Sequence, residues 1–450
     1  MTGGGGSARK PAAGGIWQAF AAVTERCPRR RVIEAAESDE AWTARELAVR
    51  ARLLADEAGL ARARGGCVAF SLPTSPAWMT AFLATQNAGV AALPLDQASA
   101  SRDWREEAAA LGATHALDGA QLVSLGRGAD GIAWRRFAVA KITSGSTGAP
   151  TVIPCRASHL LADGWNIIRT MKIRPRDRNL AILPLGHSYG LGNLVMPLVL
   201  QGTGMVTAAT YVPRQVLEWI EARRIAVLPA VPVVLQILAG IDGDYDLRTL
   251  RLVISAGAPL PAATAQDFFR RFRRHVRNFY GSSETGGICF DASGAASRAG
   301  RSVGRPMDGV SVRVTRGGRI QVSSAAVAMP RGSCTLADLG RWTDDGELEI
   351  TGRATPMANI GGRKVNPREI EAALRAIPGV ATAWVNVRSG GERDQLVGAV
   401  ESTRPKPEIV AALAAAVASW KRPRQLAVVP ELPRTARGKL DVEMLRTWFD

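Results

Sequence analysis

The segment from Ile142 to Pro154 reads ITSGSTGAPTVIP, so an apolar approach leads into small and hydroxyl-bearing residues. Small residues let a backbone come close to an anion, and successive N–H groups and hydroxyls can then surround a polyphosphate. A Walker loop would need Lys followed by Ser or Thr, which is absent here. An ordinary Ser/Gly loop is the alternative. The residue types nevertheless favour a phosphate loop made of Thr143, Ser144, Gly145, Ser146, Thr147 and Gly148.

A second segment, Asn278 to Ile288 (NFYGSSETGGI), places an aromatic ring at the end of an expected strand. Tyr280 is followed by a glycine turn, by hydroxyls that include Ser283, and by Glu284. An aromatic ring suits the face of a nucleobase, and a lone carboxylate suits the magnesium ion that accompanies nucleotide phosphates. Taken alone, the segment is compatible with a nucleotide site but does not establish one.

Two more segments carry charged side chains near tight turns. In LADLGRWTDDGELEITGR, Asp338 and Arg353 bracket a hairpin whose turn is Asp-Asp-Gly. A carboxylate is a good acceptor for both hydroxyls of a ribose. In PRTARGKLD, Lys439 follows a glycine, and a lysine held in such a turn can be delivered to an active site by a moving lid. Taken alone, this last segment is better explained as a solvated basic loop.

The elements that must position these segments alternate between helix and strand, which indicates an α/β protein. The amphipathic stretch from Thr43 to Gly59 predicts a helix that stops at glycine, and Trp78–Ala88 predicts another. Short apolar strands are expected at Cys67–Leu72, Ala91–Pro94, Leu180–Leu183, Ala226–Leu228 and Arg251–Ile254.

The composition changes near residue 340, where the hairpin is followed by a smaller unit. That unit is expected to contain helices at Pro367–Ile377 and Glu408–Trp420 and strands around Ala383–Val387 and Gln395–Val400. We therefore predict a large layered N-terminal domain at 16–355, with sheets covered by helices. A small mobile α+β lid domain follows at 356–450. Residues 1–15 are expected to form a disordered tail.

The net charge of +17 invites a nucleic-acid interpretation. The excess is nearly all Arg and is spread from Arg26 to Arg446, so we expect no nucleic-acid partner. A phosphate-rich ligand or an acidic carrier protein would account for the same charge. The five cysteines are scattered without a CxxC pair, which predicts neither disulfides nor zinc and fits a reducing cytoplasm. The best apolar run, Leu191–Leu200, is shorter than the about 20 residues of a membrane span.

The order and spacing of these segments resemble the ANL superfamily of acyl- and aryl-CoA synthetases, adenylation domains and luciferases. TSGSTGAP looks like the family's phosphate loop, and YGSSE looks like its YGxTE motif with Ser283 in the Thr place. ADLGRW…DDGELEITGR looks like its TGD…GR segment. GGRKVNPREIE looks like the motif that opens the C-terminal domain, and PRTARGK looks like the catalytic-lysine loop. The resemblance runs from about Thr43 to Leu445.

The resemblance implies a role for each matched residue. Tyr280 would stack on adenine, Glu284 would hold Mg²⁺, and Lys439 would bridge the substrate carboxylate and the α-phosphate. His187 would lie beside the carboxylate and gate the thiol tunnel. The remaining implied nucleotide contacts are Thr143, Ser144, Gly145, Ser146, Thr147 and Gly148 at the phosphates, Gly257, Ala258 and Pro259 as the other adenine wall, Gly281 and Ser283 beside Tyr280, and Asp338 and Arg353 at the ribose.

By the same resemblance the reaction is ATP-dependent activation of a carboxylic acid. A carboxylate oxygen attacks the α-phosphorus, pyrophosphate leaves, and a thiol then displaces AMP from the acyl-AMP. The thiol would belong to CoA or to the phosphopantetheine arm of a carrier protein. The implied cofactors are therefore ATP, Mg²⁺ and one of these thiols.

Two residues depart from the family pattern. Thr151 stands where a lysine usually follows the proline of the phosphate loop, which puts one phosphate contact in doubt. Pro356 stands where the pivot aspartate of the hinge is expected, and proline locks φ near about −65°. We hypothesise that the pivot shifts or that thiol transfer is slow. An unchanged thioester rate in Pro356→Asp, with adenylation also unchanged, would remove this idea.

The acyl group is constrained by what the segments lack. In the resembling adenylation domains for amino acids, an Asp near this motif pairs with the α-amine. The stretch from Pro184 to Gly190 has no acid, so the resemblance implies that a free amino acid is not the substrate. Thr285–Ile288 is small and uncharged, and Val231–Leu235 adds apolar lining. An apolar acid, either fatty or aromatic, fits these residues.

Two other functions compete with this interpretation. A weakened relative that binds nucleotide or acyl ligand as a sensor is favoured only by Thr151 and Pro356. A serine hydrolase is suggested by Gly-His-Ser-Tyr-Gly, which fits the GxSxG nucleophile elbow with Ser188 as nucleophile. Asp267 and His275 follow in triad order, but His275 lies in a stretch expected to be a surface helix.

Overall fold

The computed structural model describes residues 14–95, 104–126, 132–144, 150–353, 358–360, 363–365, 367–388, 395–435 and 438–449. The chain forms two compact units. The first contains Met1–Leu336 and Arg341–Ile350, and the second contains Ala337–Gly340 and Thr351–Asp450. Most of the expected N-terminal tail and the hinge residue Pro356 lie outside the described residues.

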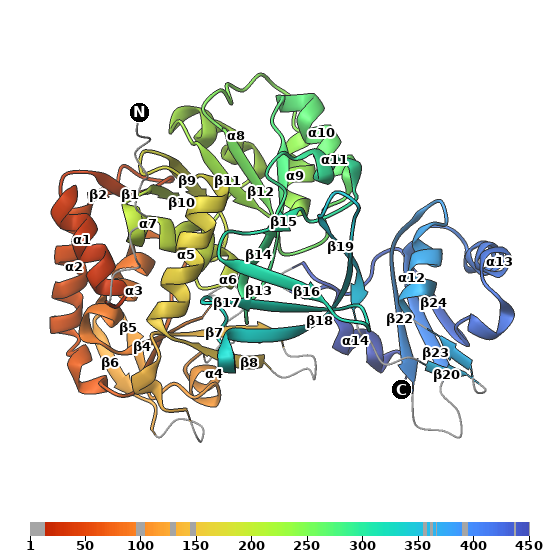
Figure 1. The fold of residues 1–450 in the computed structure, drawn as a ribbon, viewed down its shortest axis with the longest axis horizontal. Coiled ribbons are helices and arrows are strands. Elements are labelled where there is room, and N and C mark those ends of the chain that lie inside the picture. The colour runs from red at the N-terminus through yellow and green to blue at the C-terminus, as the bar shows by residue number, and fades with distance from the viewer. Residues whose placement is uncertain are drawn as a thin grey trace, which may run out of the picture. The chain divides into compact units, whose positions relative to one another are not determined.

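A nine-stranded sheet forms the centre of the first unit, in the order β15-β14-β13-β12-β11-β9-β10-β1-β2 (Figure 1). Its middle strands are parallel, and β2, β14 and β15 pair antiparallel at the edges. The strands are β1 Arg31–Ala35, β2 Ala41–Thr43, β9 Arg178–Ala181, β10 Gly204–Thr207, β11 Val227–Ala230, β12 Leu252–Ser255, β13 Val276–Ser282, β14 Gly286–Phe290 and β15 Arg305–Pro306.

Successive side chains of the central strands point to opposite faces of this sheet, and both faces are buried. Leu228 and Val253 pack into the core beneath α8 Pro213–Ala222, α9 Pro232–Ala239 and α10 Ala262–Phe272. Val227 and Leu252 face the other way and share a core with α5 Ala157–Met171 (Figure 1). A strand presents successive side chains to opposite faces, so short apolar strands of this kind need helices on both sides. The short helix α11 Ala295–Ala299 follows β14.

A second sheet in the first unit has six strands in the order β6-β5-β3-β4-β7-β8. They are β3 Cys67–Ser71, β4 Ala91–Leu95, β5 His115–Asp118, β6 Gln121–Ser124, β7 Val139–Ser144 and β8 Pro150–Cys155. The helices that precede or connect them are α1 Ile16–Arg26, α2 Ala44–Glu57, α3 Pro76–Ala88 and α4 Trp104–Ala110. Helix α2 begins with a capping box, because Thr43 accepts from the Glu46 N–H while the Glu46 carboxylate accepts from the Thr43 N–H.

One helical run in the first unit contains a π-turn. It comprises α6 Ser188–Gly190, the π-turn Leu191–Val195 and α7 Met196–Gln201. Gly190 is required in this run, because a Cβ placed there would lie 2.2 Å from the Pro184 carbonyl oxygen. The start of this helical run therefore packs directly against Pro184, which precedes it in the chain.

The remaining strands bring the chain into its second unit. A four-stranded sheet has the order β16-β17-β18-β19, with β16 Val310–Val314, β17 Arg319–Ser324, β18 Ser333–Trp342 and β19 Leu348–Arg353. Most of this sheet belongs to the first unit. The second unit contains a two-stranded pair, β20 Ala358–Ile360 and β21 Arg363–Val365, and a three-stranded sheet, β22 Val380–Arg388, β23 Gln395–Ser402 and β24 Gln425–Val429. Its helices are α12 Pro367–Arg375, α13 Lys406–Ala416 and α14 Val442–Thr447.

Most predicted elements are present, with two corrections. The helix expected over Glu408–Trp420 ends at Ala416, where Val417 has extended backbone angles. The helix expected to include His275 ends at Phe272, and His275 lies just before β13. Arg273, the residue after the helix, has left-handed backbone angles, which cost conformational energy for arginine. Helix propensity along the sequence therefore did not indicate that the helix ends at Phe272.

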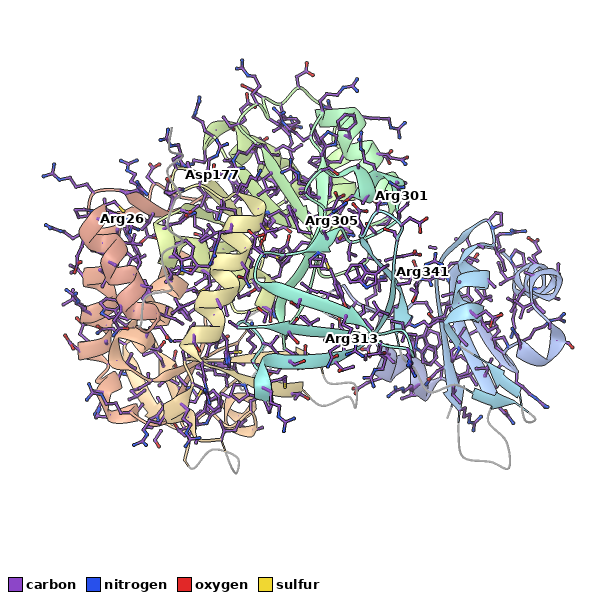
Figure 2. The ribbon with its side chains drawn as sticks, in the orientation of Figure 1. Arg26, Asp177, Arg301, Arg305, Arg313 and Arg341 are labelled. Carbon is purple, nitrogen blue, oxygen red and sulfur yellow. The ribbon has the colours of Figure 1, made fainter. Side chains whose placement is uncertain are left out.

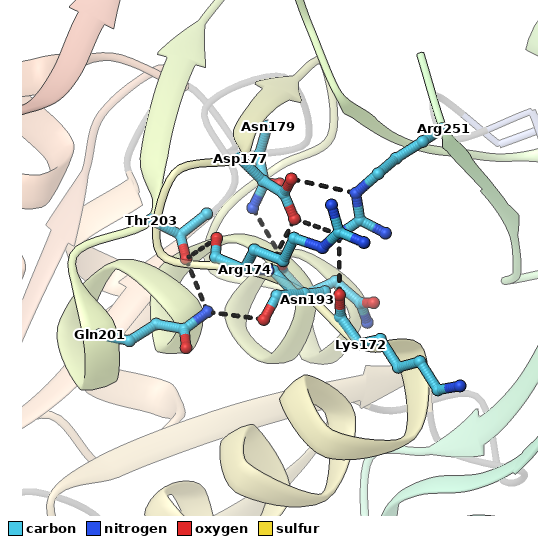
Figure 3. A network of polar contacts seen from close by, with 9 residues as sticks. Lys172, Arg174, Asp177, Asn179, Asn193, Gln201, Thr203 and Arg251 are labelled. Carbon is cyan, nitrogen blue, oxygen red and sulfur yellow. Dashed lines mark hydrogen bonds and ion pairs between the residues drawn. The ribbon is translucent and has the colours of Figure 1, made fainter. Parts of the chain in front are cut away.

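The amino ends of the central strands are tied together by a buried ion pair (Figure 3). Asp177 precedes β9 and accepts from the Arg251 Nε at 3.0 Å, and Arg251 precedes β12. Asp177 also accepts from the Arg174 N–H at 2.6 Å, while Arg251 donates to the Lys172 carbonyl at 2.8 Å. The pair therefore joins the end of α5 to two strand starts.

The positive charge is dispersed over separate elements (Figure 2). The arginines labelled there come from α1, the segment after α11, β15, β16 and β18, and are Arg26, Arg301, Arg305, Arg313 and Arg341. Part of this charge is compensated, since Arg341 pairs with Glu349 at 2.7 Å. Among the described residues, no helix has both the length and the apolar character needed to cross a bilayer.

Candidate active site

Two expected walls of the nucleotide site lie at the carboxyl ends of neighbouring parallel strands. Ser255 at the end of β12 is in register with Asn278 of β13. The exposed segment Gly257-Ala258-Pro259 leaves from β12, and the half-buried Tyr280 stands near the end of β13. In open α/β sheets this edge is where ligands bind. The register thus brings together the two residue groups predicted to enclose a base.

The turn after β13 carries Glu284 and is held by several hydrogen bonds. Ser282 and Thr285 share a hydrogen bond between their hydroxyls at 3.0 Å. The Ala328 N–H donates to the Glu284 carbonyl at 2.9 Å. The Glu284 side chain is half-buried, and its charge adds to burial in raising the pKa of the Cys334 thiol. The carboxylate therefore stands on a well-anchored turn.

The expected thiol-gating residue is linked to this turn through its neighbour. The Ser188 hydroxyl donates to the Ser283 hydroxyl at 2.9 Å. His187 is half-buried, and its carbonyl accepts the Leu191 N–H at 2.8 Å at the start of the helical run. The structure thus brings the segments of His187 and Glu284 together, although they are far apart in the sequence.

The approach to the phosphate loop is a hairpin of β7 and β8. Thr143 is paired with Thr151 across it, and the Thr143 hydroxyl donates to the Thr151 carbonyl at 3.4 Å. Ser144 ends β7 opposite Pro150. The rest of the predicted loop, Gly145, Ser146, Thr147 and Gly148, lies outside the described residues.

Two buried charged residues beneath the Glu284 turn were missed in the sequence. Lys141 on β7 is 4% exposed, and its ammonium donates to the Ser283 carbonyl at 3.5 Å. Asp163 on α5 is 3% exposed, and its Oδ1 accepts the Gly287 N–H at 2.9 Å. Burial raises the pKa of the Asp163 carboxyl, while the Lys141 charge acts against this rise. In the sequence, the feature that could have identified Lys141 is a lysine within the otherwise apolar run VAKI.

Three predicted site residues belong to the second unit. Asp338 is half-buried on β18, and Arg353 is the last residue of β19, with its side chain outside the description. Lys439 is exposed in a closed loop, since its carbonyl accepts the Thr435 N–H at 2.7 Å and Arg434 pairs with Leu440 across the loop. The described residues on either side of the predicted catalytic lysine are therefore tied to each other within their own unit.

The structure does not assemble the serine hydrolase triad. Ser188 contacts Ser283 beyond the carboxyl end of β13, whereas His275 precedes the amino end of that seven-residue strand. At about 3.3 Å per residue the strand separates them by roughly 20 Å. His275 stacks on the Phe269 ring with centroids 4.5 Å apart, and Asp267 pairs with Arg270. The hydrolase interpretation is therefore wrong.

The donor set suits a magnesium ion carried by phosphates. Within the described part of the chain, no group of three or more His, Cys, Asp or Glu residues could hold a metal by itself. Glu284 is a single half-buried carboxylate beside hydroxyl-bearing residues. Mg²⁺ commonly takes one or two protein carboxylates and completes its shell with phosphate oxygens and water. Glu284 fits this arrangement.

Comparisons with known proteins agree with this geometry. The AMP-binding enzyme family matches residues 130–321, and the AMP-binding enzyme C-terminal domain matches residues 369–439. A Mycobacterium tuberculosis CoA ligase for a methyl-dioxo-octahydro-indenyl propanoate is 29% identical over 451 residues, covering 84% of this chain and 88% of that protein. Feruloyl-CoA synthase of Amycolatopsis is 27% identical over 330 residues, covering 66% and 67%.

The solved structures give the same fold. The ATP-bound MatB structure from Rhodopseudomonas palustris superposes with a TM-score of 0.80 at 23% identity, covering 96% of this chain and 99% of that one. The chain therefore has the predicted fold, a large α/β unit followed by a small α+β unit, and shares this fold with that structure.

The chain belongs to the AMP-binding enzyme family, the ANL superfamily of adenylating enzymes. It is an ATP-dependent, AMP-forming acid–thiol ligase, which confirms the predicted class of enzyme.

Proposed function

We propose that the chain activates an apolar carboxylic acid with MgATP and transfers the acyl group to CoA. The observation that carries the substrate class is the absence of Asp, Glu, Lys and Arg from 182–191, 231–235 and 256–260. These segments, which include α6 and the first turn of α9, follow the carboxyl ends of β9, β11 and β12. An α-amine or a second carboxylate on the substrate would find no charged partner there, whereas an apolar acyl group needs none.

Val231 is an apolar residue beside Gly257, which lies in the segment that is proposed to contact the adenine. Its Cγ1 lies 3.5 Å from the position that a Cβ on Gly257 would occupy. Val231 is half-buried, so part of its side chain is available to a ligand. The other predicted stretch, Thr285–Ile288, is buried in the sheet, and Ile288 belongs to the core. Val231 is therefore the better candidate for acyl contact.

The proposed roles rest on the family resemblance and on the chemistry of each side chain. Tyr280 and Gly257–Pro259 hold the adenine, and Asp338 and Arg353 hold the ribose. Thr143 through Gly148 bind the phosphates. Glu284 would hold Mg²⁺, which when bound neutralises charge on the phosphate oxygens. Lys439 stabilises the charge that develops between the carboxylate and the α-phosphate, an effect usually worth about 3–4 kcal/mol.

The two steps conserve atoms and charge. A carboxylate oxygen forms a bond to the α-phosphorus, and the bond to the bridging oxygen breaks so that pyrophosphate leaves. The CoA sulfur then bonds to the acyl carbon, AMP leaves, and the thiol proton passes to solvent. His187, beside the Ser188–Ser283 contact, is proposed to control entry of the thiol. The protein's part is positioning and charge stabilisation.

Pyrophosphate release tests this proposal. ATP and Mg²⁺ are supplied with a panel of fatty and aromatic acids, using wild type, Lys439→Ala and Lys406→Ala. Lys406 is an exposed lysine of the same unit and serves as the matched control. We expect release with some acids, a loss of about 10² or more in Lys439→Ala and less than twofold change in Lys406→Ala. Equal activity in all three would contradict the role of Lys439.

The acceptor is tested separately. Acyl-CoA and acylated carrier protein are measured by mass spectrometry with CoA or a phosphopantetheinylated carrier as the only thiol. Thioester on CoA supports the proposal, and thioester on the carrier alone overturns the choice of CoA. Nucleotide binding without pyrophosphate release from any acid would instead favour the sensor function, to which Thr151 points.

A further inference from the structure

The turn that carries Glu284 is contacted at both ends by buried charges from other elements. At one end the Lys141 ammonium donates to the Ser283 carbonyl at 3.5 Å. At the other end the Asp163 carboxylate accepts the Gly287 N–H at 2.9 Å. Glu284 lies between these two contacts in the sequence, so the pair acts on the backbone that presents the proposed metal ligand.

Asp163 approaches this turn more closely than any residue other than glycine would allow. Gly286 has φ of +72°, and a Cβ built there would lie 2.4 Å from the Asp163 Oδ1. The close approach therefore needs glycine for both the backbone conformation and the space. A carboxylate that is 3% exposed and pressed against a turn defines the path of that turn.

Lys141 connects the same turn to the phosphate hairpin. The pairings Lys141–Ile153 and Thr143–Thr151 place Lys141 on the same face of the hairpin as both threonines, because alternate residues of a strand share a face. Thr151 stands where the resemblance led us to expect a lysine. The chain thus keeps a buried positive charge on this face, two residues further from the loop.

Opposite charges are needed for this arrangement to be stable. A buried ammonium or carboxylate loses hydration that only an opposite charge and hydrogen bonds can offset. Both side chains are buried and contact the same turn, Lys141 at the Ser283 carbonyl and Asp163 at the Gly287 N–H. The Lys141 charge opposes the rise that burial causes in the pKa of the Asp163 carboxyl. Replacing only one of them leaves the other as an uncompensated interior charge.

We propose that Lys141 and Asp163 form a buried positioning pair that fixes the Glu284 turn against the phosphate hairpin and so sets the affinity for MgATP. This inference rests on the proposed function and adds two residues that act through Glu284. Neither residue is assigned contact with the reacting atoms.

The test uses the full chain with Lys141→Met, Asp163→Asn and the double variant, beside Lys172→Met. Lys172 is an exposed lysine of the same unit and is the charge-matched control. Binding of a fluorescent ATP analogue is titrated against Mg²⁺ without an acid. Pyrophosphate exchange then gives kcat and the KM values for MgATP and for the acid, and thermal unfolding reports stability.

We expect Lys141→Met to raise both the half-saturating Mg²⁺ concentration and the KM for MgATP by tenfold or more. The KM for the acid should change by less than twofold. The double variant should recover part of the loss, because no uncompensated charge remains. Lys172→Met should match wild type.

A lower melting temperature with unchanged Mg²⁺ dependence and unchanged KM for MgATP would overturn the proposal, since it would show a merely structural role. Additive losses in the double variant would overturn the pairing. A wild type that binds MgATP but releases no pyrophosphate would refute the proposed function alone, because the binding titration still tests the pair.

Discussion

Removal of the Asp177 carboxylate should destabilise the first unit strongly. Asp177 accepts from the Arg174 N–H and from two nitrogens of Arg251, and its side chain is 6% exposed. Breaking a buried ion pair by deleting one partner costs about 3–5 kcal/mol. The Arg251 side chain is 26% exposed, so water recovers part of its solvation. We therefore expect a loss of about 3 kcal/mol in Asp177→Ala.

Equilibrium unfolding in urea measures this loss. Asp177→Asn retains an acceptor for the Arg174 N–H and should lose about 1–2 kcal/mol, the charged part of the interaction. Asp246→Ala is the matched control, because Asp246 makes the same type of contact with Arg248 at the surface. Its unfolding midpoint should equal that of wild type, since exposed pairs contribute little.

A midpoint shift in Asp177→Ala no larger than that in Asp246→Ala would refute the reasoning. It would mean that burial of the pair does not distinguish it from a surface pair. Retention of pyrophosphate release below the midpoint is also expected, because the pair joins the amino ends of the strands and the proposed site lies at their carboxyl ends.

Two further predictions concern the interior. Gly190→Ala places a Cβ against the Pro184 carbonyl oxygen, and such overpacking should lower the free energy of unfolding by about 1–3 kcal/mol. Thioester formation should also slow more than adenylation. A melting temperature equal to that of wild type would argue against this prediction. Burial raises the pKa of the Cys67 and Cys289 thiols, so few thiolates form at about pH 8 and brief iodoacetamide treatment of native protein should label Cys27 instead. Equal labelling by mass spectrometry would contradict this.

The sequence was most informative where local chemistry decides structure. Thr43 and Glu46 form the capping box at the start of the helix predicted from Thr43, and the Asp-Asp-Gly turn joins β18 and β19. Tyr280 lies near the end of β13 and Glu284 follows that strand, as expected. Each of these depends on residues close in the sequence, where spacing carries the geometry.

Contacts between distant segments could not be predicted in the same way. Lys141 and Asp163 meet the Glu284 turn only because β7, α5 and β13 pack together, and no spacing in the sequence encodes that meeting. The GxSxG pattern at Ser188 failed for the same reason. His275 has the correct order in the chain but lies at the opposite end of β13. Triads and buried pairs are properties of tertiary structure.

The π-turn at Leu191–Val195 has a consequence for how this family can vary. A π-turn holds one residue more than the equivalent α-turn. Each helical residue adds about 1.5 Å and about 100° of rotation. Gain or loss of a single codon here would therefore re-aim His187 relative to α7 while every strand keeps its register. Relatives that differ by such an insertion or deletion would then align with a one-residue offset between His187 and α7, and the direction of the His187 side chain would depend on chain length as well as on residue type.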